Sequence, residues 1–258
     1  MPDPADEPAV LIVSPHLDDA VLSCFALLTG PAPADVLTVF AGAPAPPRVA
    51  WSERAMGFAD SDATMAARRA EDARALDGLA RATYTMDLLD EDYIDLPRPP
   101  GEAYAVRKRV SAWVGENPGG RVAVPACAGR VRGRIGARLE RLLGERGKVT
   151  QHPDHVFVRD ALVELVGDGD LDELLLYEEL PYLWHGDAAA ESRRVARRTN
   201  ATLTQLELRV DRQAKASRIA RYASQLGHLA LDGRRPDDPA ALPEVESYAL
   251  LAIQVGVR

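Results

Sequence analysis

Residues 9–40 alternate between strand-like and helix-like patterns, and this alternation narrows the fold more than any other feature of the sequence. Residues 9–14 (AVLIVS) are apolar without alternation, as in a strand buried on both faces of a parallel sheet. Residues 18–28 have apolar side chains at helical spacing and are followed by Gly30, and residues 35–40 form a second strand-like run. This order predicts a βαβ unit, in which helices pack on a parallel sheet.

The strand and helix patterns continue to alternate along the rest of the chain. Further helical patterns occupy residues 63–79, 102–116, 156–166 and 212–226, and further strand-like runs occupy residues 82–88, 121–126, 171–177 and 202–210. We therefore predict a Rossmann-like α/β fold with a mostly parallel sheet and helices on both faces. Strands of the same sheet flank the proline-rich residues 43–47 and 97–101, so we predict a single domain over residues 1–258, with residues 1–8 disordered.

Composition and charge argue against several classes of protein. A net charge of -8 disfavours general nucleic-acid binding, and no run approaches the roughly 18 uninterrupted apolar residues of a membrane span. The two cysteines, Cys24 and Cys127, make no disulfide framework, and the acidic start lacks the regions of a secretory signal. We expect a cytoplasmic protein that acts on a small molecule, with no nucleic-acid or membrane partner; association into a homo-oligomer stays open.

One segment is basic, although the chain as a whole is acidic. From Arg130 to Lys148 there are six arginines and one lysine against Glu140 and Glu145. A solvated helix face is one interpretation of this basic segment, and a contact for an anionic part of a substrate is the other.

Two clusters of metal-binding residue types follow predicted strands. Residues 14–19 (SPHLDD) place an imidazole and two carboxylates at the end of the first strand, and residues 152–155 (HPDH) repeat these types at the start of a predicted helix. The carboxyl ends of parallel strands meet at one edge of a sheet, where ligands bind. We therefore expect the two clusters to converge.

The combined clusters contain enough groups for metal-dependent hydrolysis. A catalytic zinc ion takes three ligands from His and Asp or Glu and leaves a position for water. With His16, Asp19 and His155 as ligands, Asp18 and His152 remain free. Hydrolysis of an amide needs two such groups, one base and one donor to the developing oxyanion or to the leaving amine.

Each cluster also has a plainer explanation when taken alone. The pair Asp18 and Asp19 could cap a helix and interact with its dipole. Residues 152–155 could be a capped helix start without a metal. Both explanations lose weight if the two clusters meet at one edge of the sheet.

These motifs resemble the LmbE-like or PIG-L-type metal-dependent deacetylases, whose signature is Pro-His-x-Asp-Asp after the first strand and His-x-Asp-His later. The resemblance extends to an Arg-Arg-x-Glu motif, here residues 68–71, and to a late Lys…Tyr-x-Ser-Gln pattern, here Lys215 and residues 222–225. It covers most of the chain, and the two His/Asp motifs are its specific part.

The resemblance implies that His16, Asp19 and His155 bind zinc, with ferrous iron as an alternative ion. It implies that Asp18 is the general base. It also implies that His152 stabilises the tetrahedral intermediate or acts as the acid.

Two further residues receive roles from the resemblance. Asp154 would orient a histidine by hydrogen bonding, and Arg68 would contact the substrate, although an arginine at this spacing from Glu71 more often forms an intrahelical pair. The sequence departs from the family where Ala20 replaces a frequent glutamate and where residues 23–26 lack the usual glycines. These departures affect the predicted helix packing and the floor of the pocket.

The sequence predicts a zinc-dependent hydrolase that removes an N-acyl group, expected to be N-acetyl, from an amino sugar or glycoside-type small molecule. Dinucleotide-binding, phosphate-loop and serine-hydrolase motifs are absent from it. The high alanine and arginine content suggests a GC-rich bacterial genome and a role in secondary metabolism, such as antibiotic biosynthesis. The alternatives are a zinc amidase acting on a thiol conjugate, lipid or antibiotic intermediate, and a non-catalytic binding protein of the same fold.

Overall fold

The computed structural model of the chain describes residues 7–94, 97–128, 151–184 and 188–253. The basic segment from Arg130 to Lys148 and most of residues 1–8 lie outside these ranges, so the predictions for them stay predictions.

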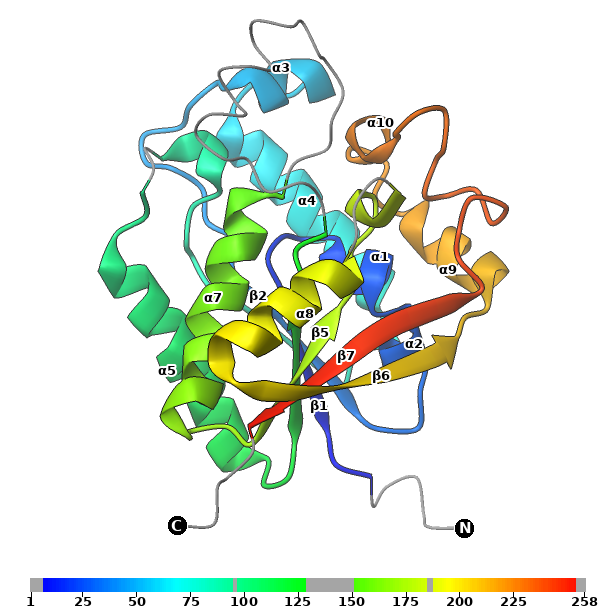
Figure 1. Cartoon of the computed structure of the whole chain (residues 1–258). Coiled ribbons are helices and arrows are strands. Elements are labelled where there is room, and N and C mark those ends of the chain that lie inside the picture. The colour runs from blue at the N-terminus through cyan, green and yellow to red at the C-terminus, as the bar shows by residue number, and fades with distance from the viewer. Residues whose placement is uncertain (1–6, 95–96, 129–150, 185–187, 254–258) are drawn as a thin grey trace, which may run out of the picture.

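A seven-stranded sheet forms the centre of the molecule, in the order β3-β2-β1-β4-β5-β7-β6 (Figure 1). The first five strands in this order are parallel: β1 (Val10–Ser14), β2 (Ala34–Thr38), β3 (Ala82–Thr85), β4 (Arg121–Pro125) and β5 (Glu173–Tyr177). The last two pair antiparallel: β6 (Ala201–Arg209) and β7 (Val245–Ile253). The predicted mostly parallel α/β fold is confirmed.

Helices cover both faces of the sheet, because alternate residues of each buried strand point to opposite sides. Leu11 and Val13 pack towards α5 (Pro100–Glu116), α7 (Pro153–Asp168) and α8 (Ala188–Thr199). Val10 and Ile12 pack towards α1 (Asp19–Ser23), α2 (Phe25–Leu28), α4 (Ser61–Leu76) and α9 (Arg212–Ile219). Within the described ranges, no helix is long and apolar enough to cross a membrane.

The shorter elements α3 (Trp51–Met56) and α10 (Leu226–Leu229) lie beyond the carboxyl ends of the parallel strands, at the top of Figure 1. Two short 3-10 turns, η2 (Glu91–Tyr93) and η3 (Tyr182–Trp184), follow strands at this same edge. The connections gathered here contain both predicted clusters.

The predicted helix over residues 18–28 is interrupted at Cys24 and becomes α1 and α2. The carboxylate of Glu246 accepts hydrogen bonds from the backbone N–H groups of Phe25 (3.0 Å) and Ala26 (2.8 Å). These are the groups that a helix start leaves unsatisfied. A carboxylate from β7 therefore begins a new helix where local spacing predicts continuity.

The sequence patterns left residues 245–253 unassigned, and the structure places them as β7 between β5 and β6. The predicted helix over residues 212–226 is also shorter than expected, since α9 ends at Ile219 and a turn leads into α10. Strand insertion and helix length here depend on contacts between distant parts of the chain.

Lys215 and Glu246 form a buried ion pair that joins α9 to β7. Lys215 Nζ lies 2.6 Å from Glu246 Oε1, with side chains 1% and 4% exposed, and Tyr248 Oη donates to Glu246 Oε2 at 2.6 Å. Because the same carboxylate begins α2, this pair supports the helices that follow β1.

We predict that Lys215→Met destabilises the protein by about 3–5 kcal/mol, because it leaves Glu246 buried without its cation. Urea denaturation measures the loss. Lys108→Met, at an exposed position of α5, is the control and should change the unfolding free energy by less than about 0.5 kcal/mol. An unchanged midpoint in Lys215→Met would contradict the role given to this pair.

Candidate metal centre

The turn after β1 is closed by its own side chains. Ser14 Oγ donates to the carbonyl oxygen of His16 (2.7 Å) and accepts from the N–H of Ala20 (3.0 Å). The carboxylate of Asp19 accepts from the N–H of His16 (2.8 Å). These bonds fix the path between strand and helix, and they hold the buried side chains of His16 and Asp19 at the carboxyl edge of the sheet.

The start of α7 positions the second cluster. His152 is the N-cap residue, and its Nδ1 accepts from the N–H of Asp154 (3.3 Å), with Pro153 in the first turn. Because Nδ1 accepts, the proton of a neutral His152 ring is assigned to Nε2, which lies 3.4 Å from Glu91 Oε1. His155 follows, 1% exposed.

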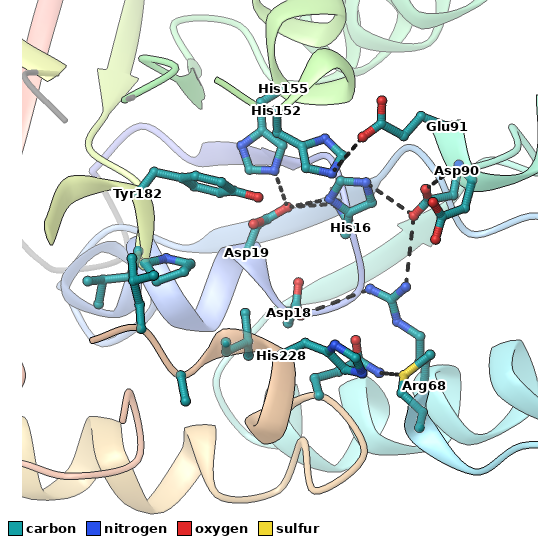
Figure 2. A pocket seen from close by; sticks show the side chains of 18 of the residues that line it. His16, Asp18, Asp19, Arg68, Asp90, Glu91, His152, His155, Tyr182 and His228 are labelled. Atoms are coloured by element: carbon teal, nitrogen blue, oxygen red, sulfur yellow. Dashed lines mark hydrogen bonds and ion pairs between the residues drawn. The ribbon is translucent and has the colours of Figure 1, made fainter. Parts of the chain in front are cut away.

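The carboxylate of Asp19 lies between two imidazoles (Figure 2). Its Oδ2 atom is 3.4 Å from His16 Nδ1 and 3.4 Å from His155 Nε2. Ligand atoms at 2.0–2.1 Å around a tetrahedral zinc ion are separated by about 3.3 Å. Asp19 is therefore spaced from each of the two imidazoles as two ligands of one zinc-sized ion would be.

Asp154 holds His16 from the other side of the ring. Its Oδ2 is 3.1 Å from His16 Nε2, while Arg98 donates to its Oδ1 (3.0 Å from Nε) and stacks over Phe40, 4.0 Å from the ring centroid. The partner that the sequence left open for Asp154 is thus His16. An Nε2–H that donates to Asp154 leaves the Nδ1 lone pair of His16 facing Asp19.

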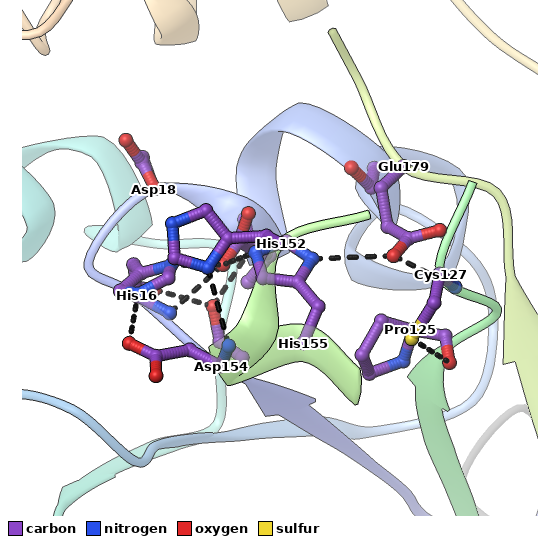
Figure 3. A network of polar contacts seen from close by, with 12 residues as sticks. His16, Asp18, Pro125, Cys127, His152, Asp154, His155 and Glu179 are labelled. Atoms are coloured by element: carbon purple, nitrogen blue, oxygen red, sulfur yellow. Dashed lines mark hydrogen bonds and ion pairs between the residues drawn. The ribbon is translucent and has the colours of Figure 1, made fainter. Parts of the chain in front are cut away.

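Glu179 holds the ring of His155 as Asp154 holds that of His16. Figure 3 shows Glu179 bonded to both His155 and Cys127. Its Oε1 is 3.2 Å from His155 Nδ1, and its carboxylate accepts from the N–H groups of Cys127 (2.9 Å) and Ala128 (3.0 Å). Glu179 is completely buried. This arrangement leaves Nε2 of His155 facing Asp19.

Two groups of three donors in the described part of the chain have ligand atoms that all lie within 4.8 Å of one another, and neither contains Asp19: His16, His152 and His155, and His16, Asp90 and Asp154. In the first group, the capping bond places the proton of His152 on Nε2, the nitrogen facing Glu91. In the second group, Asp154 already accepts from Arg98, His16 and the N–H of Glu91. Asp19 Oδ2 also accepts a hydrogen bond, from the N–H of His16, but it alone has the spacing of a metal ligand to both His16 and His155.

The surrounding carboxylates stabilise positive charge at the site. Burial lowers the pKa of His16, but Asp90 and two hydrogen-bonded carboxylates outweigh it and raise the pKa well above its ordinary value. Burial also lowers the pKa of His155, yet Asp19 and Glu179 raise it to about 9. A site that retains protons in this way also favours a divalent cation, which displaces them on binding. Two imidazoles and a carboxylate suit zinc or ferrous iron.

Asp18 is the N-cap residue of α1, but its side chain makes no capping bond, so capping does not explain it. The side chain is 7% exposed and lines the cavity, and its nearest cation is Arg68, with Nη2 at 4.0 Å from Oδ2. Burial and the neighbouring charge of Asp19 raise the pKa of Asp18 to about 6. A carboxylate with this pKa is suited to accept a proton near neutral pH.

Arg68 extends towards Asp18 and Asp90 and does not pair with Glu71. Its Nη1 is 3.9 Å from Asp90 Oδ2, and its buried Nε has no hydrogen-bond partner within the described residues. Glu71 instead accepts from the N–H (2.9 Å) and Oγ (2.7 Å) of Ser224. The guanidinium thus keeps hydrogen-bonding capacity for a ligand.

Sequence reasoning missed four residues of the site: Asp90, Glu91, Arg98 and Glu179. Asp90 Oδ2 lies 3.4 Å from His16 Nε2. Burial and the charges of Asp154, Asp90 and Asp92 raise the pKa of Glu91 to about 7. Two of these acids follow β3 and Glu179 follows β5, so the rule that sites form beyond strand ends could have found them.

The donors open into a cavity of about 370 Å³. All predicted site residues except Asp154 line it: His16, Asp18, Asp19, Arg68, His152 and His155. Tyr182 stands edge-on to His155, with ring centroids 5.3 Å apart. His228 also lines the cavity.

No family model matches the chain, and no curated protein matches it. Among solved structures, it is similar to a deacetylase–bog complex in the biosynthesis pathway of teicoplanin (25% identity, TM-score 0.69, 96% of this chain and 99% of that one). It is similar to the A40926 pseudoaglycone deacetylase Dbv21 (26%, 0.67, 97% and 100%). The zinc-inhibited form of teicoplanin deacetylase Orf2 shares the fold (24%, 0.69, 96% and 99%).

Helix α4, which carries Arg68, is hydrogen-bonded to the segment before α10. Arg68, Glu71 and Asp72 lie at i, i+3 and i+4, which places them on one side of the helix. Besides the bonds from Ser224 to Glu71, Tyr222 Oη donates to Asp72 Oδ1 at 2.8 Å. The two less specific motifs of the sequence therefore contact each other beside the cavity.

We predict that Glu179→Gln raises the dissociation constant for the metal about 10- to 100-fold, because His155 loses the carboxylate that orients its ring. Competition with a chelator measures the change. Glu173→Gln, on the strand β5 that precedes Glu179 and paired with Arg121 at the surface, is the control and should bind metal like the wild type. Equal affinities for wild type and Glu179→Gln would contradict this role.

Asp72 should make the protein less stable as the pH rises. Burial, which outweighs the hydrogen bond from Tyr222, raises its pKa to about 7, against about 3.9 in an unfolded chain. Between these values the folded state binds more protons than the unfolded state, so the unfolding free energy falls with pH, by at most about 1.4 kcal/mol per unit.

We therefore predict that Asp72→Asn loses less stability than the wild type between pH 4 and 7, as measured by urea denaturation across that range. Asp62→Asn, at an exposed position of the same helix, should keep the wild-type slope. Parallel curves for wild type and Asp72→Asn would show that Asp72 titrates as it does in the unfolded chain.

Proposed function

We propose that the protein is a metal-dependent N-deacetylase of the LmbE-like or PIG-L type, which removes an N-acetyl group from an amino sugar. The observation that carries this proposal is the Asp19 carboxylate, spaced at 3.4 Å from two imidazoles that are each held by a further carboxylate. Asp18 and His152 line the same cavity without being needed as ligands.

The similar structures support the reaction and indicate a kind of substrate. The two at 25% and 26% identity are a deacetylase of teicoplanin biosynthesis and a deacetylase of the A40926 pseudoaglycone. We propose a substrate of the same kind, an antibiotic intermediate that carries an N-acetylated amino sugar.

His16, Asp19 and His155 would hold the ion. When bound there, a divalent metal supplies a Lewis acid that polarises the amide carbonyl and lowers the pKa of water. Zinc is the expected ion and ferrous iron the alternative. One similar structure is a zinc-inhibited form, so the activity test has to include both ions.

Three side chains around this position have separate roles: one transfers a proton and two donate hydrogen bonds. Asp18 accepts the proton of the attacking water and passes it to the nitrogen of the leaving amine as the C–N bond breaks, with Arg68 keeping a positive charge 4.0 Å from its carboxylate. His152 stays neutral, since burial and the two nearby imidazoles lower its pKa to about 3. Its Nε2–H then donates a hydrogen bond to the carbonyl oxygen as negative charge develops there. Arg68 Nε–H has no acceptor among the residues that the structure describes, so it can donate to an oxygen of the substrate.

The test measures bound metal and acetate release together, with N-acetyl amino sugars as substrates and with zinc or ferrous iron added. We predict about one ion per chain in the wild type. Asp18→Asn should retain the ion and lose about 10²- to 10⁴-fold in kcat, because only the base is removed. Asp19→Asn should lose the ion itself.

Asp170→Asn, at an exposed position, is the control for changing an aspartate and should match the wild type. Wild-type turnover in Asp18→Asn would contradict its role as base. Metal binding without release of any acyl group, with either ion, would favour the non-catalytic binding protein.

A further inference from the structure

The walls of the cavity differ in chemistry. One side carries the carboxylates of Asp90 and Glu91, and Tyr182 lies across His16 from them (Figure 2). The residues before Tyr182, the last residue of α10 and the two residues after it contribute a second, hydrophobic lining, here called the apolar wall: Leu180, Pro181, Leu229, Ala230 and Leu231. The proposed deacetylation uses none of these side chains.

The first part of the apolar wall is fixed to the metal-bearing region. The N–H of Leu180 donates to Ser23 Oγ on α1 (3.2 Å), and the Leu180 side chain is 1% exposed. The hydroxyl of Ser23 therefore anchors this part of the wall beside the site.

The second part is held at both ends. Before α10, Tyr222 and Ser224 bond to Asp72 and Glu71 of α4. After it, Leu231 exchanges backbone hydrogen bonds with Arg234, both at 2.9 Å.

The two parts are also joined to each other. The guanidinium of Arg234 lies 6.0 Å from the ring centroid of Trp184, which belongs to the turn that follows Leu180. The wall is therefore a built surface, although Leu229 and Leu231 remain partly exposed.

Partly exposed leucines lining a cavity favour an apolar ligand. Covering hydrophobic surface removes it from water, at up to about a fourfold gain in affinity for each buried methylene. Hydroxyl groups of a sugar would gain no hydrogen bonds from these side chains. A cavity of about 370 Å³ lies within the range that holds drug-sized ligands, so it has room for a group beyond the reacting amide.

We infer that the substrate carries an apolar group, alkyl or aryl, close to the amide, and that the apolar wall binds it. This inference rests on the proposed deacylation and specifies its substrate class. The group is attached either, as an aglycone, to the N-acetylated amino sugar or to the acyl carbon, in which case the acyl group removed is longer than acetyl. The wall would recognise the same chemistry in both cases.

The experiment compares three amides on the metal-loaded wild type: N-acetylglucosamine, N-hexanoylglucosamine and the hexyl glycoside of N-acetylglucosamine. We expect kcat/KM for at least one extended amide to exceed that of N-acetylglucosamine about tenfold or more. The amide that gains identifies the side on which the group is attached. This comparison uses only the wild type, so its result does not depend on whether a variant folds.

The double variant Leu229→Ser/Leu231→Ser should bring the ratio of extended to unextended kcat/KM close to one. Leu206→Ser, at an exposed leucine of β6 outside the cavity, should keep the wild-type ratio. Hydrolysis of all three amides at equal kcat/KM, or an advantage that survives the double variant, would overturn the inference alone. No acyl release from any amide would instead overturn the proposed deacylation.

Discussion

The position of the Asp19 carboxylate is the constraint on which the site depends. This carboxylate closes the turn after β1 by accepting from the N–H of His16. It also lies 3.4 Å from one ring nitrogen of His16 and 3.4 Å from one of His155. A buried carboxylate is costly unless charges or hydrogen bonds compensate it. Here the compensation comes from imidazoles that are themselves held in place, so the arrangement attracts a cation whether that cation is a proton or a metal.

Asp154 and Glu179, the carboxylates that hold the two imidazoles, are also compensated by neighbouring groups of the fold. Asp154 is balanced by the buried Arg98, whereas Glu179 is balanced by His155 and by backbone N–H groups at the end of β4. The groups involved come from connections after β1, β3, β4 and β5, which only a parallel sheet delivers to one edge. Arg98 stacks on Phe40, so the hydrophobic core helps to set the orientation of a metal-facing ring.

The sequence predicted the parallel sheet and the two His/Asp clusters because both are local patterns. Residues 9–14 read as a buried strand on their own, and a cluster such as HPDH is dense enough to be noticed without its surroundings. Glu179 and Arg98 look like ordinary charged loop residues until folding shows which side chains face them. The break at Cys24 was unpredictable for the same reason, since the carboxylate that causes it lies on β7.

X-ray absorption spectroscopy on protein loaded with one equivalent of zinc tests the ligand set most directly, because it identifies the atoms around the ion. The account predicts a first shell that contains two imidazoles and one carboxylate, at about 2.0–2.2 Å, with no sulfur. A shell of three imidazoles would place His152 on the metal and remove it as a hydrogen-bond donor. That result, or a shell without imidazole, would contradict the site described here.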